Sequence, residues 1–277
     1  MICFDARSVL PLFAAVLLTG CGGGGNGDPP STPLADELGA CDRLADVSGP
    51  ATWVDPADTM SDACAAPADK GICVSGSTIV AIDRFDETGA GQLGNFYVQD
   101  TSEDPQPFSG MTVFGATFSP PDLRLAEGDV IDMNGLFMEF LGPTGSRFGQ
   151  CRTLPEVSGT LSFRFDGSRA AVPRIITDAA ELKTYEGARP YLGMLVKVLD
   201  VTLATAGTNS SGRFTADLAV GGGIPQSDVP RISNELYDIE KDGPPLVQGG
   251  VFKSVTGVVT YFYGFKIAPR SPADFES

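Results

Sequence analysis

Beyond residue 70, hydrophobic residues occur in short runs that alternate with polar residues, and glycine or proline separates the runs. The longest runs lie at 73–83, 94–100 and 128–140, and again at 194–203, 212–218 and 249–262. Alternation with a period of two is typical of β-strands that bury one face. Each set reads as a long strand, a second strand, an irregular stretch, a long strand with an internal glycine and a short strand. The pattern therefore predicts an all-β chain with two successive barrels of about five strands each, at 70–155 and 190–277.

One glycine interrupts each of the strands predicted at 128–140 and 249–262, at Gly135 and Gly257. A glycine inside a strand marks a bulge or a sharp bend, and small barrels turn their corners at such positions. We therefore expect both strands to bend at these glycines.

Helical patterns are short and lie outside the predicted barrels. Residues 177–183 are expected to form one helix, because Asp178 followed three residues later by Glu181 is an N-terminal capping pattern. This helix belongs to a connector at 156–189. A second helix is expected near residues 35–44, in a leader segment at 34–69 whose fold the pattern does not indicate.

The first apolar run, residues 8–18, follows a single basic residue, Arg7. Eleven helical residues rise about 16 Å, which is too short to cross a bilayer. A short apolar segment followed by small residues is typical of a secretory signal peptide, here residues 1–20. Residues 18–21, Leu-Thr-Gly-Cys, resemble the bacterial lipobox, and this resemblance implies cleavage before Cys21 and a diacylglycerol on its sulfur. The alternative is an ordinary signal peptide with a chance cysteine.

Residues 21–33 contain mostly glycine, proline and small polar residues and are predicted to be a tether. A flexible chain of this length spans roughly 20 Å. Gly22, rather than an aspartate, follows the cysteine. By resemblance to the sorting of other lipoproteins, this implies the outer membrane of a Gram-negative bacterium, with the folded part facing the periplasm or the cell surface.

The chain carries a net charge of −16 and contains no histidine. Catalysis by Ser-His-Asp or Cys-His groups and metal sites with histidine ligands are therefore excluded. Residues 69–160 hold five basic and thirteen acidic side chains, whereas residues 161–277 hold twelve and thirteen. Because phosphate backbones require Lys and Arg, nucleic acid is expected to bind at most weakly, through residues 170–277.

Four cysteines remain if Cys3 leaves with the signal peptide and Cys21 is lipidated. They are Cys41, Cys64, Cys73 and Cys151. An even number in an exported chain predicts two disulfides. We favour the pairing of residues 41 with 64 and 73 with 151, because it closes one loop in the leader and one in the first barrel. The other two pairings and a four-thiolate zinc site are alternatives, although paired CxxC spacings are absent.

Aromatic side chains could stack on a ligand, as they do on barrels of this size. The candidates are Tyr97, Phe137, Tyr261 and Tyr263. Alternation sends about half of such residues into the barrel core instead. Tyr261 and Tyr263 are expected to form an exposed pair, because they alternate with Phe262.

Acidic residues gather in two predicted loops and are weak candidates for calcium ligands. They are Asp83, Asp86, Glu87, Asp100, Glu103 and Asp104. Carboxylate oxygens suit calcium, but the EF-hand spacing is missing and solvated acidic loops are the alternative. No other metal site and no catalytic set is predicted. Arg270 and Asp274 are expected to form an ion pair that anchors the C-terminus.

Several segments resemble a known fold family. The segments GNFYVQD, SGMTVF and AEGDVIDMNGLFMEF, and in the second copy RPYLGMLVKVLDVTL and FKSVTGVVTYFYGFKI, are similar to OB-fold modules of secreted bacterial proteins. Such modules often accompany nuclease or phosphatase domains. The resemblance implies two tandem OB-like barrels. One departure is the stretch 114–128, which is too short and rich in proline for the helix that many OB folds place there.

These observations predict a non-catalytic envelope lipoprotein, a binding or assembly module with no cofactor beyond the lipid on Cys21. Its expected partners are the membrane, through the lipid, and a protein or glycan of the envelope. The alternative from another class is a hydrolytic subunit or accessory of a nuclease or phosphoesterase. A weak binder of single-stranded nucleic acid or of glycan is a further alternative.

Overall fold

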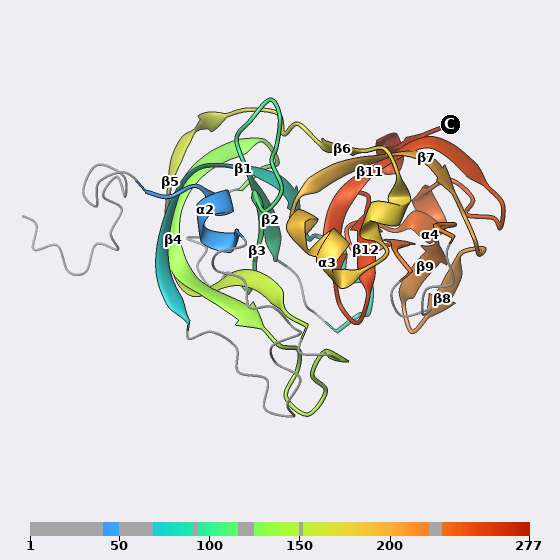
Figure 1. The fold of residues 1–277 in the computed structure, drawn as a ribbon, viewed down its shortest axis with the longest axis horizontal. Coiled ribbons are helices and arrows are strands. Elements are labelled where there is room, and N and C mark those ends of the chain that lie inside the picture. The colour runs from blue at the N-terminus through green and yellow to red at the C-terminus, as the bar shows by residue number, and fades with distance from the viewer. Residues whose placement is uncertain (1–40, 50–68, 91–93, 116–124, 150–151, 222–228) are drawn as a thin grey trace, which may run out of the picture.

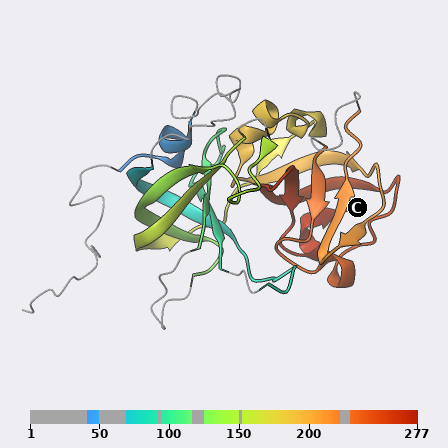
Figure 2. The same ribbon diagram turned by 90° about the horizontal axis from the view of Figure 1, so that it is seen from below.

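The computed structural model describes residues 41–49, 69–90, 94–115, 125–149, 152–221 and 229–277. Two β-sheets lie side by side along the long axis of the molecule (Figure 1), and the view at 90° shows the same separation (Figure 2). The predicted signal peptide, lipobox and tether, residues 1–33, lie outside the described residues, as does most of the predicted leader. None of the helices in the described ranges has the length and apolar character that crossing a membrane requires.

The first sheet is a closed five-stranded barrel. Its strands are β1 (Lys70–Ile82), β2 (Phe96–Asp100), β3 (Gly110–Val113), β4 (Asp129–Phe140) and β5 (Leu154–Ser168). Their spatial order is β1-β2-β3-β5-β4, and pairing of β4 with β1 closes the barrel. All pairs are antiparallel except β3 with β5. The first predicted barrel is thus confirmed, but β5 extends it to residue 168, into the stretch expected to be a connector.

A short helix, α2 (Leu44–Ser48), packs against this barrel. Leu44 and Val47 are buried in the same hydrophobic cluster as the barrel interior. The carboxylate of Asp100 accepts hydrogen bonds from the backbone N–H groups of Leu44 and Ala45, at 2.9 and 3.1 Å. Residues 35–40 of the helix expected near 35–44 lie outside the described part; residues 41–43 are not helical, and α2 begins at residue 44.

One disulfide, Cys41–Cys73, fixes the segment before α2 to β1, with Cα atoms 5.1 Å apart. The favoured pairing of 41 with 64 and 73 with 151 is therefore wrong. Residues 41–42 run beside β1, where Asp42 forms a parallel bridge with Val74, and this places the two cysteines opposite each other. Loop length along the chain carried no information about that contact. Cys64 and Cys151 lie outside the described residues.

The second sheet contains eight strands. They are β6 (Arg174–Ile176), β7 (Leu195–Thr202), β8 (Thr208–Ser210), β9 (Arg213–Asp217), β10 (Arg231–Ser233), β11 (Val251–Tyr261), β12 (Phe265–Ala268) and β13 (Phe275–Glu276). The order is β6-β7-β11-β12-β10-β9-β8, with β13 on β11. Unlike the first sheet, it is not closed by a ladder; a single bridge, Leu203 with Leu218, links the ends of β7 and β9. A second closed barrel therefore remains a prediction.

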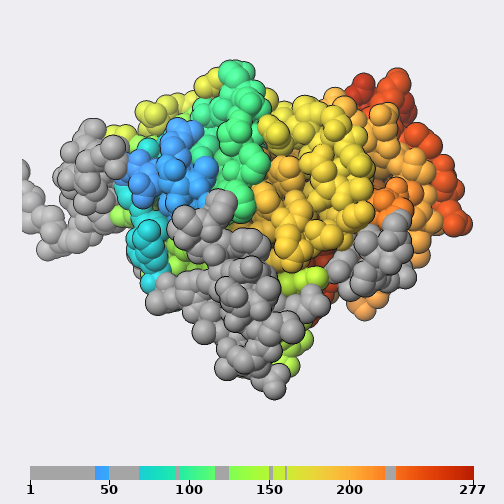
Figure 3. Space-filling view, viewed as in Figure 1, coloured from blue at the N-terminus to red at the C-terminus, as the bar shows by residue number. Residues whose placement is uncertain are grey.

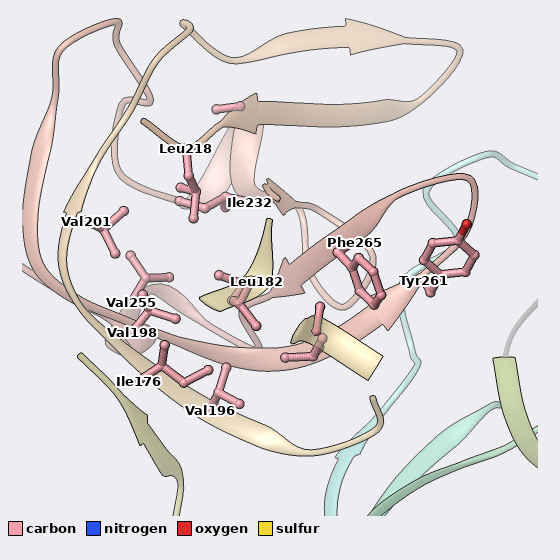
Figure 4. Packing of buried hydrophobic residues seen from close by; sticks show 14 of the residues in the cluster. Ile176, Leu182, Val196, Val198, Val201, Leu218, Ile232, Val255, Tyr261 and Phe265 are labelled. Atoms are coloured by element: carbon pink, nitrogen blue, oxygen red, sulfur yellow. The ribbon is translucent and has the colours of Figure 1, made fainter. Parts of the chain in front are cut away.

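The two sheets nevertheless repeat one strand order. Five strands of the second sheet correspond in chain order to the five strands of the barrel: β7, β9, β10, β11 and β12. Their order in space is the same as in the barrel, and the one parallel pair among them, β10 with β12, corresponds to β3 with β5. Buried side chains fill the space that these strands enclose, where Val198, Val255, Leu182 and Ile232 point toward one another (Figure 4). The predicted duplication of the strand pattern is confirmed at this level.

The connector after β5 consists of short helical turns that cover one end of the second sheet. They are η3 (Ala179–Leu182), α3 (Tyr185–Ala188) and η4 (Arg189–Tyr191); later in the chain come α4 (Ile239–Asp242) and η6 (Pro272–Asp274). Asp178 caps η3 through the N–H of Ala180, so the predicted cap is confirmed. The expected helix at 177–183 is a single 3-10 turn, because Lys183 already ends it.

The internal glycines of β4 and β11 act in two ways. The pairing of β4 with β5 shifts register between Asn134 and Leu136, so β4 is irregular at Gly135 as predicted. No register shift occurs at Gly257 in its pairing with β7. A Cβ on Gly257 would lie 2.8 Å from the backbone of Ala268, so this glycine admits the close approach of β12.

At one point of the junction, the backbone of the barrel and the backbone that leads into the second sheet are in direct contact. A Cβ on Gly110 would lie 2.4 Å from the N of Met194, and one on Gly193 would lie 2.5 Å from the N of Met111. Phe108 N–H donates to the carbonyl of Pro190 at 2.6 Å across this contact. In the space-filling view, the green loop before β3 touches the yellow connector directly (Figure 3).

A buried ion pair also crosses the junction. Arg189 Nη2 lies 2.6 Å from Glu139 Oε1, and both side chains are 1% exposed. Thr153 Oγ1 donates to the other oxygen of Glu139 at 2.7 Å, and the Tyr185 hydroxyl donates to the carbonyl of Thr153 at 2.6 Å. Burial raises the pKa of Glu139 above its ordinary value, although the charge of Arg189 and the hydrogen bond from Thr153 act in the opposite direction. Removing one partner of such a pair leaves a buried charge unpaired, which is strongly destabilising.

The close approach at Gly193 predicts a specific loss of stability. Gly193 and Gly249 both have φ of 75°, but a Cβ on Gly249 would meet nothing within 4 Å. Gly193→Ala should lower the free energy of unfolding by about 1–3 kcal/mol more than Gly249→Ala, because only the former forces two backbones apart. Urea denaturation of both variants measures this difference; equal losses would contradict the tight junction.

Candidate functional site: a cavity between the two sheets

A cavity of about 390 Å³ lies between the barrel and the second sheet. From the barrel side, its polar walls include Asp83, Glu87, Tyr97 and Glu156. From the second sheet, its walls include Arg213, Glu235, Tyr261, Phe262 and Lys266. Its volume falls in the range of sites that hold small molecules. Because each sheet supplies part of the wall, the cavity exists only while the junction holds the sheets together.

Two cations face the cavity from the second sheet, and each has a carboxylate beside it. Lys266, in β12, forms an ion pair with Glu235, which also accepts a hydrogen bond from the Thr260 hydroxyl. Arg213 Nε, at the start of β9, lies 3.9 Å from an oxygen of Glu87. The two cationic groups lie 5.3 and 5.7 Å from the centre of the Phe262 ring, within cation–π distance.

Asp83 follows the end of β1 and is partly buried at the cavity wall. Its carboxylate accepts a hydrogen bond from the N–H of Phe85 at 3.3 Å. Burial, together with the negative charges of Glu87 and Glu235, raises the pKa of Asp83 to about 7 against the lowering effect of that hydrogen bond. Burial likewise raises the pKa of Glu87.

Glu156 and Tyr97 are two buried polar side chains on the barrel wall. Glu156, in β5, is 3% exposed, and Tyr97, in β2, is 8% exposed. Among the described residues, the Glu156 carboxylate and the Tyr97 hydroxyl have no hydrogen-bond or ion-pair partner, and both side chains line the cavity. Burial alone raises the pKa of Glu156 to about 7. Buried polar groups are nearly always hydrogen-bonded, so both groups are available to a ligand.

The predicted stacking residues have separate environments. Tyr97 and Tyr261 line the cavity, whereas Phe137 is 5% exposed and packs in the barrel core. Tyr261 is only 4% exposed, so the expected exposed pair is wrong. The ring of Tyr261 packs edge-on against Phe148 at a centroid distance of 4.9 Å, which holds it inward. Tyr263 is 40% exposed and hydrogen-bonds Ser146.

The six acidic calcium candidates do not converge. In the part of the chain that the structure describes, no three acidic or sulfur side chains form a metal-binding group. Asp100 caps α2, Asp86 accepts from the N–H of Ala90, Glu103 pairs with Arg169, and Asp104 pairs with Arg174 at 3.0 Å. Only Asp83 and Glu87 reach the cavity. Four of the six therefore have structural partners of their own.

The predicted ion pair near the C-terminus is confirmed. Arg270 contacts both oxygens of Asp274, at 2.9 and 3.0 Å. Arg270 Nη1 also donates to the carbonyl of Val80, in β1, at 3.2 Å. The pair therefore ties the second sheet to the barrel as well as fixing the last turn.

The sequence offered faint signals for the cavity residues that the pattern analysis missed. Lys266 is the single charge within the apolar run Phe265–Ala268, and Glu156 stands between Pro155 and Val157 at the start of a long strand. A charged residue inside an apolar strand is rarely fully buried without a function or a partner. Nothing in the sequence placed these residues on one cavity, because they are more than 100 positions apart.

Comparison with known proteins assigns the chain to no family. No family model matches the chain, and no curated protein matches it. Among solved structures, the chain is similar to a murine DNA-binding protein bound to double-stranded DNA, with 15% identity over 72% of this chain and 93% of that one. The TM-score of 0.32 is too low for this similarity to carry an argument about fold or function.

The buried carboxylate of Glu156 predicts a pH-dependent effect on stability. Its pKa is raised from 4.5 to about 7 in the folded state, so the folded protein binds that proton more tightly than the unfolded chain does. The contribution of Glu156 to stability is therefore lost as pH rises from 4.5 through 7. Glu156→Gln should be more stable than the wild type at pH 8, by about 3 kcal/mol, and close to it below pH 5.

Urea denaturation at pH 4.5 and pH 8 measures this difference. Glu186→Gln, on the exposed face of α3, is the matched control and should follow the wild type at both values. A Glu156→Gln variant with the same pH dependence as the wild type would show that this carboxyl is not desolvated.

Proposed function

We propose that the protein is a non-catalytic lipoprotein of the bacterial outer membrane that holds a small ligand in the cavity between two OB-like sheets. The cavity carries this proposal, because it presents two buried polar groups, Glu156 and Tyr97, that have no partner among the described residues. The ligand belongs to the cell envelope and is either free or part of a glycan or protein.

The OB-like assignment rests on strand order. The first sheet is a closed barrel with the order 1-2-3-5-4 and one parallel pair, and five strands of the second sheet repeat that order without a closing ladder, which supports an OB-like fold for both. The second copy is a partly open barrel, joined at its last edge by the Leu203–Leu218 bridge. Partial opening is common in this fold, and here it leaves the edge of β7 free to add β6.

Nucleic acid is a poor candidate for the ligand. The described cavity wall holds four carboxylates and two cations, and both cations have acidic neighbours. Phosphate binding depends on free Lys and Arg, which this wall does not present among the residues named above. The proposal therefore places recognition in the cavity and not on a strand surface.

Lipid anchoring is testable with one substitution. Cys21→Ala removes the sulfur that would carry the lipid, so the protein should move from the membrane fraction to the soluble fraction of the envelope. Cys3→Ala, within the signal peptide, is the matched control and should stay with the membrane. Fractionation followed by immunoblotting distinguishes them. Membrane retention of Cys21→Ala would contradict anchoring.

Ligand capture by the cavity is tested separately from anchoring. Leu154 is half-buried on the cavity wall, so Leu154→Trp should fill the space. We expect ligand-observed NMR with a mixed panel of small sugars, amines and carboxylates to detect compounds that bind the wild type. Leu154→Trp should bind the same compounds at least tenfold more weakly. Leu136→Trp, on an exposed position outside the cavity, is the control. A panel without hits, or hits that both variants retain, would contradict capture in the cavity.

A further inference from the structure

We propose that the ligand of this cavity is an organic cation, a small amine whose ammonium group pairs with Glu156. This inference rests on the proposed function and narrows it to one chemical class. It depends on the charges that face the cavity, on the polar side chains left without partners and on the aromatic walls.

The charges on the cavity wall are unbalanced. Four carboxylates face the cavity, from Asp83, Glu87, Glu156 and Glu235, against the two cations Arg213 and Lys266. Glu235 neutralises Lys266, and Glu87 lies beside Arg213. Two carboxylates therefore remain without a cation among these wall residues, and a positively charged ligand supplies what they lack.

Glu156 is the strongest single reason for a cation. Its carboxylate is on the wall, it is 3% exposed, and within the described residues it accepts no hydrogen bond. A charge buried in this way costs several kcal/mol unless it is paired. A bound ammonium group repays that cost, whereas a neutral ligand leaves the charge unpaired and an anion adds repulsion.

The rest of the wall suits the body of such a ligand. Tyr97, Tyr261 and Phe140 contribute aromatic surface from three different strands. The faces of aromatic rings attract cations and also cover alkyl chains. The Tyr97 hydroxyl, which has no partner in the described part of the chain, can accept a second hydrogen bond from the same ligand.

Binding of a cation should strengthen as pH rises. The other charged or titratable groups on the cavity wall are Glu87 and Tyr97 from the barrel side, and Arg213, Glu235, Tyr261 and Lys266 from the second sheet. Burial raises the pKa of both Glu156 and Asp83 to about 7, so each is partly protonated near neutrality. An amine stays charged over this range, so its affinity should rise between pH 6 and pH 8 as the carboxyls ionise.

Three probes with the same five-carbon chain test the charge directly: cadaverine, 1,5-pentanediol and glutarate. Titration of the purified full-length protein in detergent, followed by ligand-observed NMR at pH 8, should show cadaverine binding at least tenfold more tightly than pentanediol, with glutarate weakest. Glu156→Gln should weaken cadaverine at least tenfold and leave pentanediol unchanged. Glu186→Gln should change neither.

The pH series adds a readout that a folding defect would not reproduce. Cadaverine affinity should rise at least threefold from pH 6 to pH 8 in the wild type, and this rise should shrink in Glu156→Gln. Tighter binding of glutarate or pentanediol that Leu154→Trp abolishes would overturn the cation assignment and leave ligand capture intact. Failure of all three probes would overturn the cation assignment; capture itself fails if the wider panel gives no hits, or gives hits that Leu154→Trp retains.

Discussion

The contact on which the structure depends is the backbone approach at Gly110 and Gly193. At this point the backbone of β3 and the backbone of the segment before β7 are in direct contact, since a Cβ on either glycine would meet backbone nitrogen at 2.4–2.5 Å. Gln99 strengthens the contact, because its side-chain oxygen accepts the N–H of Leu195 at 2.9 Å. Two small β-units that would otherwise be separate modules are fixed in one relative position.

That fixed position explains why charged groups can be buried in the junction. Glu139 and Arg189 sit at its centre with 1% of each side chain exposed, and Thr153 and Tyr185 complete their hydrogen bonds. A buried pair gives little net stability against an apolar core, but it penalises any other arrangement strongly. The pair therefore specifies the docking of the connector against β4 and β5. Glu156, three residues after Thr153 in the chain, lacks such a partner and lines the cavity instead.

Much of the β-structure followed from local pattern. The strands β1, β2, β4, β7, β9 and β11 all lie where alternation and glycine punctuation predicted them. The helical cap at Asp178 and the Arg270–Asp274 ion pair also follow from residues three or four positions apart. Interactions of this range depend on local geometry, so sequence alone is sufficient to find them.

Two of the failed predictions, the disulfide pairing and the exposed tyrosine pair, concern contacts between distant residues. Cys41 pairs with Cys73 because the segment before α2 lies along β1, and Tyr261 turns inward because Phe148, from another loop, packs on it. The pairing register of a strand, and which of its side chains are buried, depend on the segments that pack against it. A single sequence does not show which segments these are.

The sequence by itself determined a duplicated β-pattern, an acidic first half and the absence of histidine chemistry, and it predicts a lipobox at Cys21. Only the tertiary structure decided that one sheet closes and the other does not, and that Glu156 and Lys266 share a cavity. The reason is physical: alternation fixes which side of a strand is buried, whereas the residues that meet across a junction depend on backbone packing between segments far apart in the chain.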